Sequence, residues 1–261
     1  NLEVMSVMAA LAGGSKKLKF GMNVASMGLR DPVLTAKACA TIDVLSGGRL
    51  LPAFGVGSAL SRDFIATGRD TKGRGKRTEE SLQIMSALWR EDSVNFQGDY
   101  YQLIDATISP RPVQSPMPLW VGGSAPQAIA RTARWGTGWQ AGIESAAEIK
   151  PVIEAIKTSA GALGRKIDDD HFGAGFGFRF GKQSDPMVQK YNEVLATRLG
   201  KDPAAYSAVG GVDEMMAMVQ DFHAAGAHKF ILRPIASGTA DMIEQTKMLV
   251  EHLLPAINAI N

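Results

Sequence analysis

Short runs of aliphatic and aromatic residues alternate with helical patterns along most of the chain, and this alternation constrains the fold more than any other feature. Such alternation is typical of βα units around a parallel sheet and argues against a β-sandwich. No linker long enough to divide the chain interrupts it, so residues 1–261 are expected to form a single domain. The predicted strands are Leu18–Val24, Arg49–Val56, Pro118–Val121, Gly138–Ala141, Phe172–Phe180 and Lys229–Pro234.

The helices are predicted from their apolar faces and from the residues at their ends. Asp31 and Pro32 suit the N-cap and the first turn of a helix that Gly47 ends. Val94–Ile108 alternates around a glycine and predicts a small hairpin, whereas the polar stretch 181–206 predicts an additional helix. Apolar residues at helical spacing predict further helices over 82–89, 149–156, 212–222 and 243–254.

Composition narrows the class of partner. The net charge is only +2 and basic residues are scattered among carboxylates, so we expect no nucleic-acid partner and a small-molecule ligand instead. Apolar stretches such as Val4–Ala12 are shorter than the ~20 residues that span a bilayer, which predicts no membrane segment. The single cysteine, Cys39, excludes an internal disulfide or a thiolate metal cluster and fits a cytoplasmic protein. No metal site is expected.

A glycine-rich turn follows the strand at Leu119–Val121. Gly122 and Gly123 let a ligand approach the backbone, and Ser124 with Gln127 predicts a capping box for the next helix. The first amides of that helix, at the positive end of its dipole, suit an anion such as a cofactor phosphate. An ordinary strand-to-helix turn with a well-made cap is the alternative interpretation.

Other strand ends carry small residues rather than acids and bases. The segments 54–58 and 23–26 suit a floor under a flat ring system, although a plain strand terminus is the alternative for the second. Glu144, Arg179 and Arg233 are the nearest charged candidates, and His171, just before a strand, is expected on the far face. Because proton-moving groups are scarce, a cofactor is expected to perform the difficult chemical step.

Several motifs, in order, resemble the luciferase-like monooxygenase family. They are FGMNV at 20–24, RDPVLTAKACATIDVLSGGR at 30–49, FGVGS at 54–58, RGKRTEESLQIMSALW at 74–89, SPRPVQSPMPLWVGGSAP at 109–126, ARWGTGWQAG at 133–142 and GGVDEMMAMVQDFHAAGAHKFILRP at 210–234. The resemblance implies an α/β fold, a (β/α)8 TIM barrel, whose rim binds FMN or, alternatively, coenzyme F420.

The same resemblance implies which residues bind the cofactor. The phosphate is expected on Gly122, Gly123 and Ser124, with the segment Trp139–Gly142 beside it. The strand at Asn23 and Val24 is expected to carry a non-prolyl cis peptide that supports the ring. Ser58 is included among the cofactor-binding residues. F420-dependent sugar-phosphate and alcohol dehydrogenases of the family have a carboxylate where this chain has Ser58, so those reactions are not expected; no catalytic residue is assigned.

The family's first two strands precede the residue that matches Asn1, so we expect a further N-terminal portion of ~60 residues, enough for two βα units. With FMN, the expected activity is a monooxygenase acting on a small organic substrate and supplied by a separate flavin reductase. With F420, it is hydride transfer. A homodimer is also expected. The alternatives are a non-catalytic flavin-binding protein and a sugar-phosphate barrel enzyme.

Overall fold

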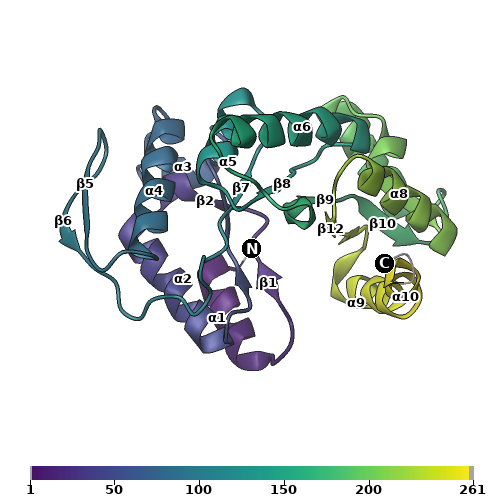
Figure 1. The fold of residues 1–261 in the computed structure, drawn as a ribbon. Helices are drawn as coiled ribbons and strands as arrows, with labels where there is room; N and C mark the ends of the chain where they lie inside the picture. The colour runs from purple at the N-terminus through teal and green to yellow at the C-terminus, as the bar shows by residue number, and fades with distance from the viewer. Residues whose placement is uncertain (1, 259–261) are drawn as a thin grey trace. The chain divides into compact units, whose positions relative to one another are not determined.

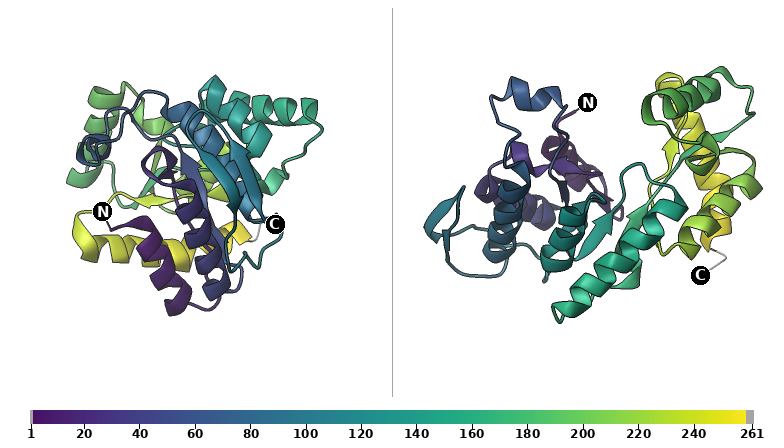
Figure 2. Two further views of the ribbon diagram at one scale, coloured as in Figure 1. Left: turned by 90° about the vertical axis from the view of Figure 1, so that its left-hand side faces the viewer. Right: turned by 90° about the horizontal axis from the view of Figure 1, so that it is seen from above.

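The computed structural model describes residues 2–258, which fall into two compact units (Figures 1 and 2). Unit 1 comprises the described residues up to Gln140 together with Ile156–Ile167, and unit 2 comprises Ala141–Ala155 together with the described residues from Asp168 onward. Both units combine helices with parallel strands, as the alternating pattern predicts.

The sheet of unit 1 is parallel and its strands are buried. Phe54 pairs with Ala25 on one side and with Val121 on the other, and Trp120 pairs with Gly138. A second parallel pair continues two of these strands toward their amino ends. The neighbouring strands are β2 (Ala25–Ser26), β4 (Ala53–Gly55), β7 (Trp120–Gly122) and β8 (Gly138–Gln140), and the second pair is β1 (Phe20–Gly21) with β3 (Leu50–Leu51).

Both predicted ends of one helix in unit 1 are confirmed, whereas the predicted start of another is wrong. Asp31 accepts a hydrogen bond from the amide of Leu34, and Gly47 ends the same helix in the left-handed region at φ 64°, both as predicted. The predicted capping box at Ser124 is wrong, because Pro126 starts the next helix and makes Ala125 its N-cap. The helices are α1 (Val4–Gly14), η1 (Met27–Leu29), α2 (Pro32–Ser46), α3 (Arg62–Ala66), α4 (Arg74–Leu88) and α5 (Pro126–Trp135).

An antiparallel hairpin stands beside α4 (Figure 1). Its strands are β5 (Val94–Gln97) and β6 (Gln102–Ala106). The carboxylate of Glu80, on α4, accepts the amides of Asp99, Tyr100 and Tyr101 at 2.8, 3.0 and 3.2 Å. These bonds tie the turn of the hairpin to the helix.

Unit 2 contains a strand that the sequence pattern did not predict. β11 (Ser207–Gly210) pairs in parallel with β10 (Gly177–Phe180), which also pairs with β13 (Arg233–Pro234). The four residues of β11 follow a polar stretch and include the first glycine of the pair at 210–211, so no apolar run marks them. A second parallel pair joins β9 (Phe172–Ala174) and β12 (Lys229–Phe230), so the predicted strands Phe172–Phe180 and Lys229–Pro234 are each split in two.

The helices complete unit 2. The polar stretch 181–206 is mostly helical, as predicted, although it is divided into three short segments. No helix within residues 2–258 is both long enough and apolar enough to cross a membrane. The helices are α6 (Ala146–Ala162), whose last residues belong to unit 1, η2 (Asp169–His171), α7 (Pro186–Glu193), η3 (Val194–Arg198), η4 (Pro203–Ala205), α8 (Val212–Ala224), α9 (Gly238–Met248), η5 (Leu249–Leu253) and α10 (Leu254–Asn258).

Candidate functional site

Val24 links the ends of two strands in unit 1. The peptide bond between Asn23 and Val24 is cis, as the family resemblance implies. A Cβ added to Gly55, the last residue of β4, would lie 2.9 Å from Cγ2 of Val24, and one added to Gly122, the last residue of β7, would lie 3.0 Å away. Both glycines are therefore required for the close approach of the Val24 side chain.

A hollow of about 810 Å³ opens beside this valine. Its size falls within the range of small-molecule sites, roughly 300–1,000 Å³. Polar and apolar groups share its wall, and the segment Asn23–Ser26 contributes four of its lining residues. The other lining residues are Leu2, Glu3, Val4, Met22, Leu29, Arg30, Asp63, Ala66 and Thr67.

An ion pair lies at the wall of the hollow. Nη2 of Arg30 contacts Oε1 of Glu3 at 2.7 Å, and Glu3 also accepts the amide of Ser6 at the start of α1. Burial raises the pKa of Glu3, but the bonds from Arg30 and Ser6 outweigh it and lower the pKa to about 2. The carboxylate is therefore ionised at neutral pH. Sequence reasoning missed this pair, because its members are 27 residues apart and no local pattern marks them.

Trp139 holds the glycine turn after β7 through a hydrogen bond. Its indole Nε1 donates to the carbonyl of Gly123 at 2.8 Å, and the side chain is fully buried. Gly123 has φ 109°, a conformation that favours glycine, and an added Cβ would lie 3.2 Å from Cβ of Ala128. No side chain caps the first turn of α5. Trp139 thus supports the turn, whose backbone can receive an anion.

Two other predicted cofactor-binding residues lie apart from this turn in sequence. Ser58 occupies an exposed turn before α3, where its hydroxyl accepts the amide of Leu60 at 3.2 Å. Gly142 belongs to unit 2. There its amide donates to Glu144 at 2.6 Å and its carbonyl accepts from Arg233 at 3.3 Å, so two of the predicted charged candidates meet at this glycine.

The third charged candidate, Arg179, holds several elements of unit 2 together. It donates to Asp185 at 2.9 Å, to Asp241 at 3.0 Å and to the carbonyl of Ile235 at 2.8 Å. The hydrogen bond to Asp185, followed by that to Asp241, raises the pKa of Arg179 against the opposing effect of burial. These contacts indicate a structural role.

His171 lies in η2, just before β9, which is the amino end of that strand as predicted. Its ligand atoms, with those of Asp168 and Asp170, fall within 4.8 Å of one another. However, Lys229 already contacts Asp170 at 3.0 Å and supplies a positive charge there. The grouping is also largely exposed, as is common for acidic clusters on protein surfaces.

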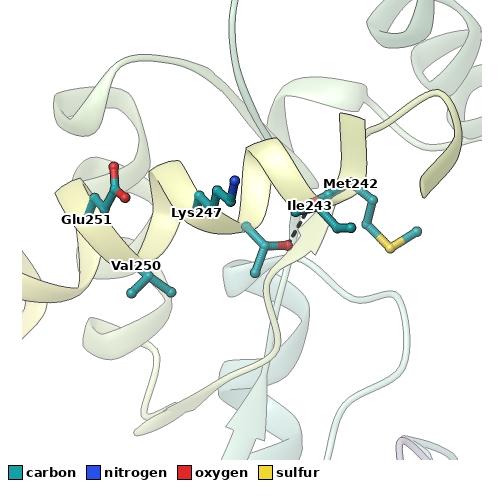
Figure 3. Close-up of a pocket in the computed structure, with 6 residues that line it drawn as sticks. Met242, Ile243, Lys247, Val250 and Glu251 are labelled. Atoms are coloured by element: carbon teal, nitrogen blue, oxygen red, sulfur yellow. Dashed lines mark hydrogen bonds between the residues drawn. The ribbon is translucent and has the colours of Figure 1, made fainter. Parts of the chain in front are cut away.

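A second hollow, of about 330 Å³, lies along α9 and η5 in unit 2 (Figure 3). Met242, Ile243 and Val250 line it together with Thr246, Lys247 and Glu251. All six residues come from one continuous helical stretch, and the wall is mainly apolar. Ligand sites usually combine apolar walls with converging polar groups from several elements, so this groove is not the candidate site.

The model of the family described as luciferase-like monooxygenase matches residues 1–242. An F420-dependent glucose-6-phosphate dehydrogenase of Amycolatopsis mediterranei (strain U-32) is 33% identical over 168 residues, which are 62% of this chain and 50% of that protein. An FMNH(2)-dependent dimethylsulfone monooxygenase of Pseudomonas putida is 31% identical over 169 residues, 63% of this chain and 46% of that protein. The chain thus matches about half the length of these curated relatives.

Among solved structures, an F420-dependent secondary alcohol dehydrogenase superposes with a TM-score of 0.82 at 20% sequence identity. The superposition covers 97% of this chain and 83% of that one. The fold is therefore that of the luciferase-like (β/α)8-barrel proteins, which confirms the predicted fold class.

Proposed function

The chain belongs to the luciferase-like monooxygenase family, and from this premise we propose that it is an oxidoreductase that holds coenzyme F420 and exchanges a hydride with a small organic substrate. The packing of Val24 against Gly55 and Gly122, beside the 810 Å³ hollow, carries the proposal. That hollow favours an enzyme over a protein that only stores the cofactor, because a storage protein needs no room for a substrate.

The residues of unit 1 fit such a cofactor. Val24 presents a branched apolar side chain on which a flat ring can rest. The two strand-end glycines allow this side chain to lie close to the backbone of β4 and β7. The turn at Gly123 and Ser124, before the first turn of α5, offers backbone amides and the helix dipole to the phosphate group. Trp139 holds the carbonyl of Gly123 in place, which keeps the turn in one conformation.

A bound deazaflavin would supply the hydride-transfer chemistry, and the protein would bind and orient both reactants. Glu3 stays ionised beside Arg30, so it contributes charge and not a proton to the hollow at neutral pH. The family resemblance implies a carboxylate at the position of Ser58 in sugar-phosphate and alcohol dehydrogenases, so we do not propose sugar phosphates and simple alcohols as substrates.

FMN with monooxygenase activity is the second candidate, which the dimethylsulfone monooxygenase relative favours. F420 is preferred because the F420-dependent relative has the higher identity, 33% against 31%, and an F420-dependent dehydrogenase shares the fold. A separate flavin reductase belongs to the FMN candidate. A homodimer stays a prediction.

Titration of the protein with F420 and with FMN, followed by fluorescence, tests the proposal. We expect F420 to bind at least tenfold more tightly than FMN. Gly123→Val should weaken binding at least tenfold. A valine is strained at the positive φ of this position, and its Cβ would crowd Ala128. Gly161→Ala, on α6 with open space around it, is the matched control. Failure of both cofactors to bind below about 100 μM would contradict the proposal.

A further inference from the structure

A buried arginine with an unpartnered guanidinium nitrogen lies on α5. Arg131 is only 5% exposed, and its Nε has no hydrogen-bond partner. Burial lowers the pKa of Arg131, and the charge of Glu79 offsets this only in part. Glu79 contacts the exposed Arg134 at 3.7 Å, and no carboxylate within residues 2–258 lies at ion-pair distance from Arg131. A buried cation is costly when nothing compensates its charge.

The guanidinium of Arg131 reaches the first turn of α4. A Cβ added to Gly75 would lie 3.4 Å from its Nη2. The N-cap of α4 is Gly73, which has no side chain to bond the first amides of the helix. One turn later, the fully buried hydroxyl of Thr78 also has no hydrogen-bond partner. The buried guanidinium of Arg131 therefore lies at a helix start without a side-chain cap, where α4 packs against α5, and the unpartnered hydroxyl of Thr78 follows on the same helix.

All of these groups are hydrogen-bond donors, and this property defines the ligand that they suit. A guanidinium, the amides of an uncapped helix start and a hydroxyl can all donate hydrogen bonds, and the first two carry positive charge. We propose that Arg131, Thr78 and the first turn of α4 form a binding site for one oxyanion, a phosphate group. Phosphate supplies both the negative charge and the several acceptor oxygens that this set of donors requires.

The phosphate has two possible sources. It belongs either to a free ion or substrate or to the bound cofactor, whose phosphate would then lie here and not on the turn at Gly123 and Ser124. The proposal does not rest on the proposed function, because inorganic phosphate alone is a sufficient probe of the site.

Calorimetric titration with inorganic phosphate at constant ionic strength tests the site. We expect Arg131→Met to weaken phosphate binding at least tenfold and Thr78→Val to weaken it about threefold. Arg134→Met, three residues along the same helix and exposed, should leave binding unchanged. Equal affinity in the wild type and in Arg131→Met would overturn the proposal.

Thermal unfolding without phosphate separates this role from a structural one. A methionine removes an uncompensated charge, so the Tm of Arg131→Met should equal or exceed that of the wild type. Added phosphate should then raise the Tm of the wild type and not that of the variant. A Tm of the variant several degrees below the wild type in phosphate-free buffer would contradict the proposal, because it would indicate that Arg131 supports the fold.

Competition identifies the source. If the cofactor supplies the phosphate, inorganic phosphate will compete with FMN or F420, and Arg131→Met will weaken FMN binding without affecting riboflavin, which lacks the phosphate. If the ion is separate, phosphate and cofactor will bind together. Phosphate binding that depends on Arg131, with no binding of either cofactor, would leave this site standing and remove the proposed function.

Discussion

The strand ends of the two units differ in the side chains that they carry. In unit 1, β4 and β7 end in Gly55 and Gly122, and a valine side chain fills the space that their missing side chains leave. In unit 2, β10 includes Arg179, which joins two carboxylates and a carbonyl from other segments. The valine packed on these glycines also lines a hollow in which a ligand has room, whereas the charged groups around Arg179 already bond one another. The difference shows that strand ends within one fold can either leave room for a ligand or join neighbouring segments, depending on their side chains.

The largest expected effect comes from removing Arg179, which forms ion pairs with Asp185 and Asp241. Arg179→Met should lower the free energy of unfolding by about 3 kcal/mol, because it leaves Asp185 and Asp241 close together without their shared cation. Urea denaturation measures this change. Arg134→Met, which removes an exposed pair at 3.7 Å, should cost less than about 0.5 kcal/mol. A loss below about 1 kcal/mol for Arg179→Met would show that these charges do not brace unit 2.

The next effect concerns the valine and its glycines. Gly55→Ala should cost about 2 kcal/mol, because its Cβ would lie 2.9 Å from Cγ2 of Val24 and the neighbours must shift. Val24→Ala removes that methyl group, so the double variant should recover at least about 1 kcal/mol relative to the sum of the single changes. A double-mutant cycle by urea denaturation measures this coupling. Additive losses would mean that the valine does not determine the need for glycine.

Features with a local cause were predictable from the sequence. The ends of α2 follow from Asp31 and Gly47, because a cap and a left-handed turn depend only on nearby residues. The start of α5 was predicted too early, because Ser124 with Gln127 imitates a capping box although Pro126 begins the helix. β11 was missed because a strand of only four residues carries no periodic signal.

The site was only partly predictable, for a related reason. The turn at 122–124 and the small residues at 23–26 stand out in sequence, but the direction of each side chain does not. Resemblance placed Trp139 near the cofactor, yet its indole proved to bond the carbonyl of Gly123 from a buried position. The pair of Glu3 and Arg30 and the buried state of Arg131 arise from packing between elements, which no local pattern encodes.

The smallest expected effect sharpens the comparison through pH. In unit 2, Glu148 accepts hydrogen bonds from Tyr206, from the amide of Ser145 and from Lys201. Burial raises the pKa of Glu148, but these bonds outweigh it and lower the pKa from 4.5 to about 2. A carboxylate whose pKa falls on folding stabilises the protein fully above the unfolded value, and that contribution is lost as the pH falls from about 4.5 through 2.

The side chain of Glu148 is 44% exposed, so solvent screening reduces the contribution to about 1 kcal/mol. Urea midpoints measured at pH 5, 4, 3 and 2 should fall less steeply for Glu148→Gln than for the wild type. Glu154→Gln, on the same helix and exposed, should follow the wild-type curve. Parallel curves for Glu148→Gln and the wild type would mean that the charge of this carboxylate does not brace unit 2, and the contrast with unit 1 would then rest on Arg179 alone.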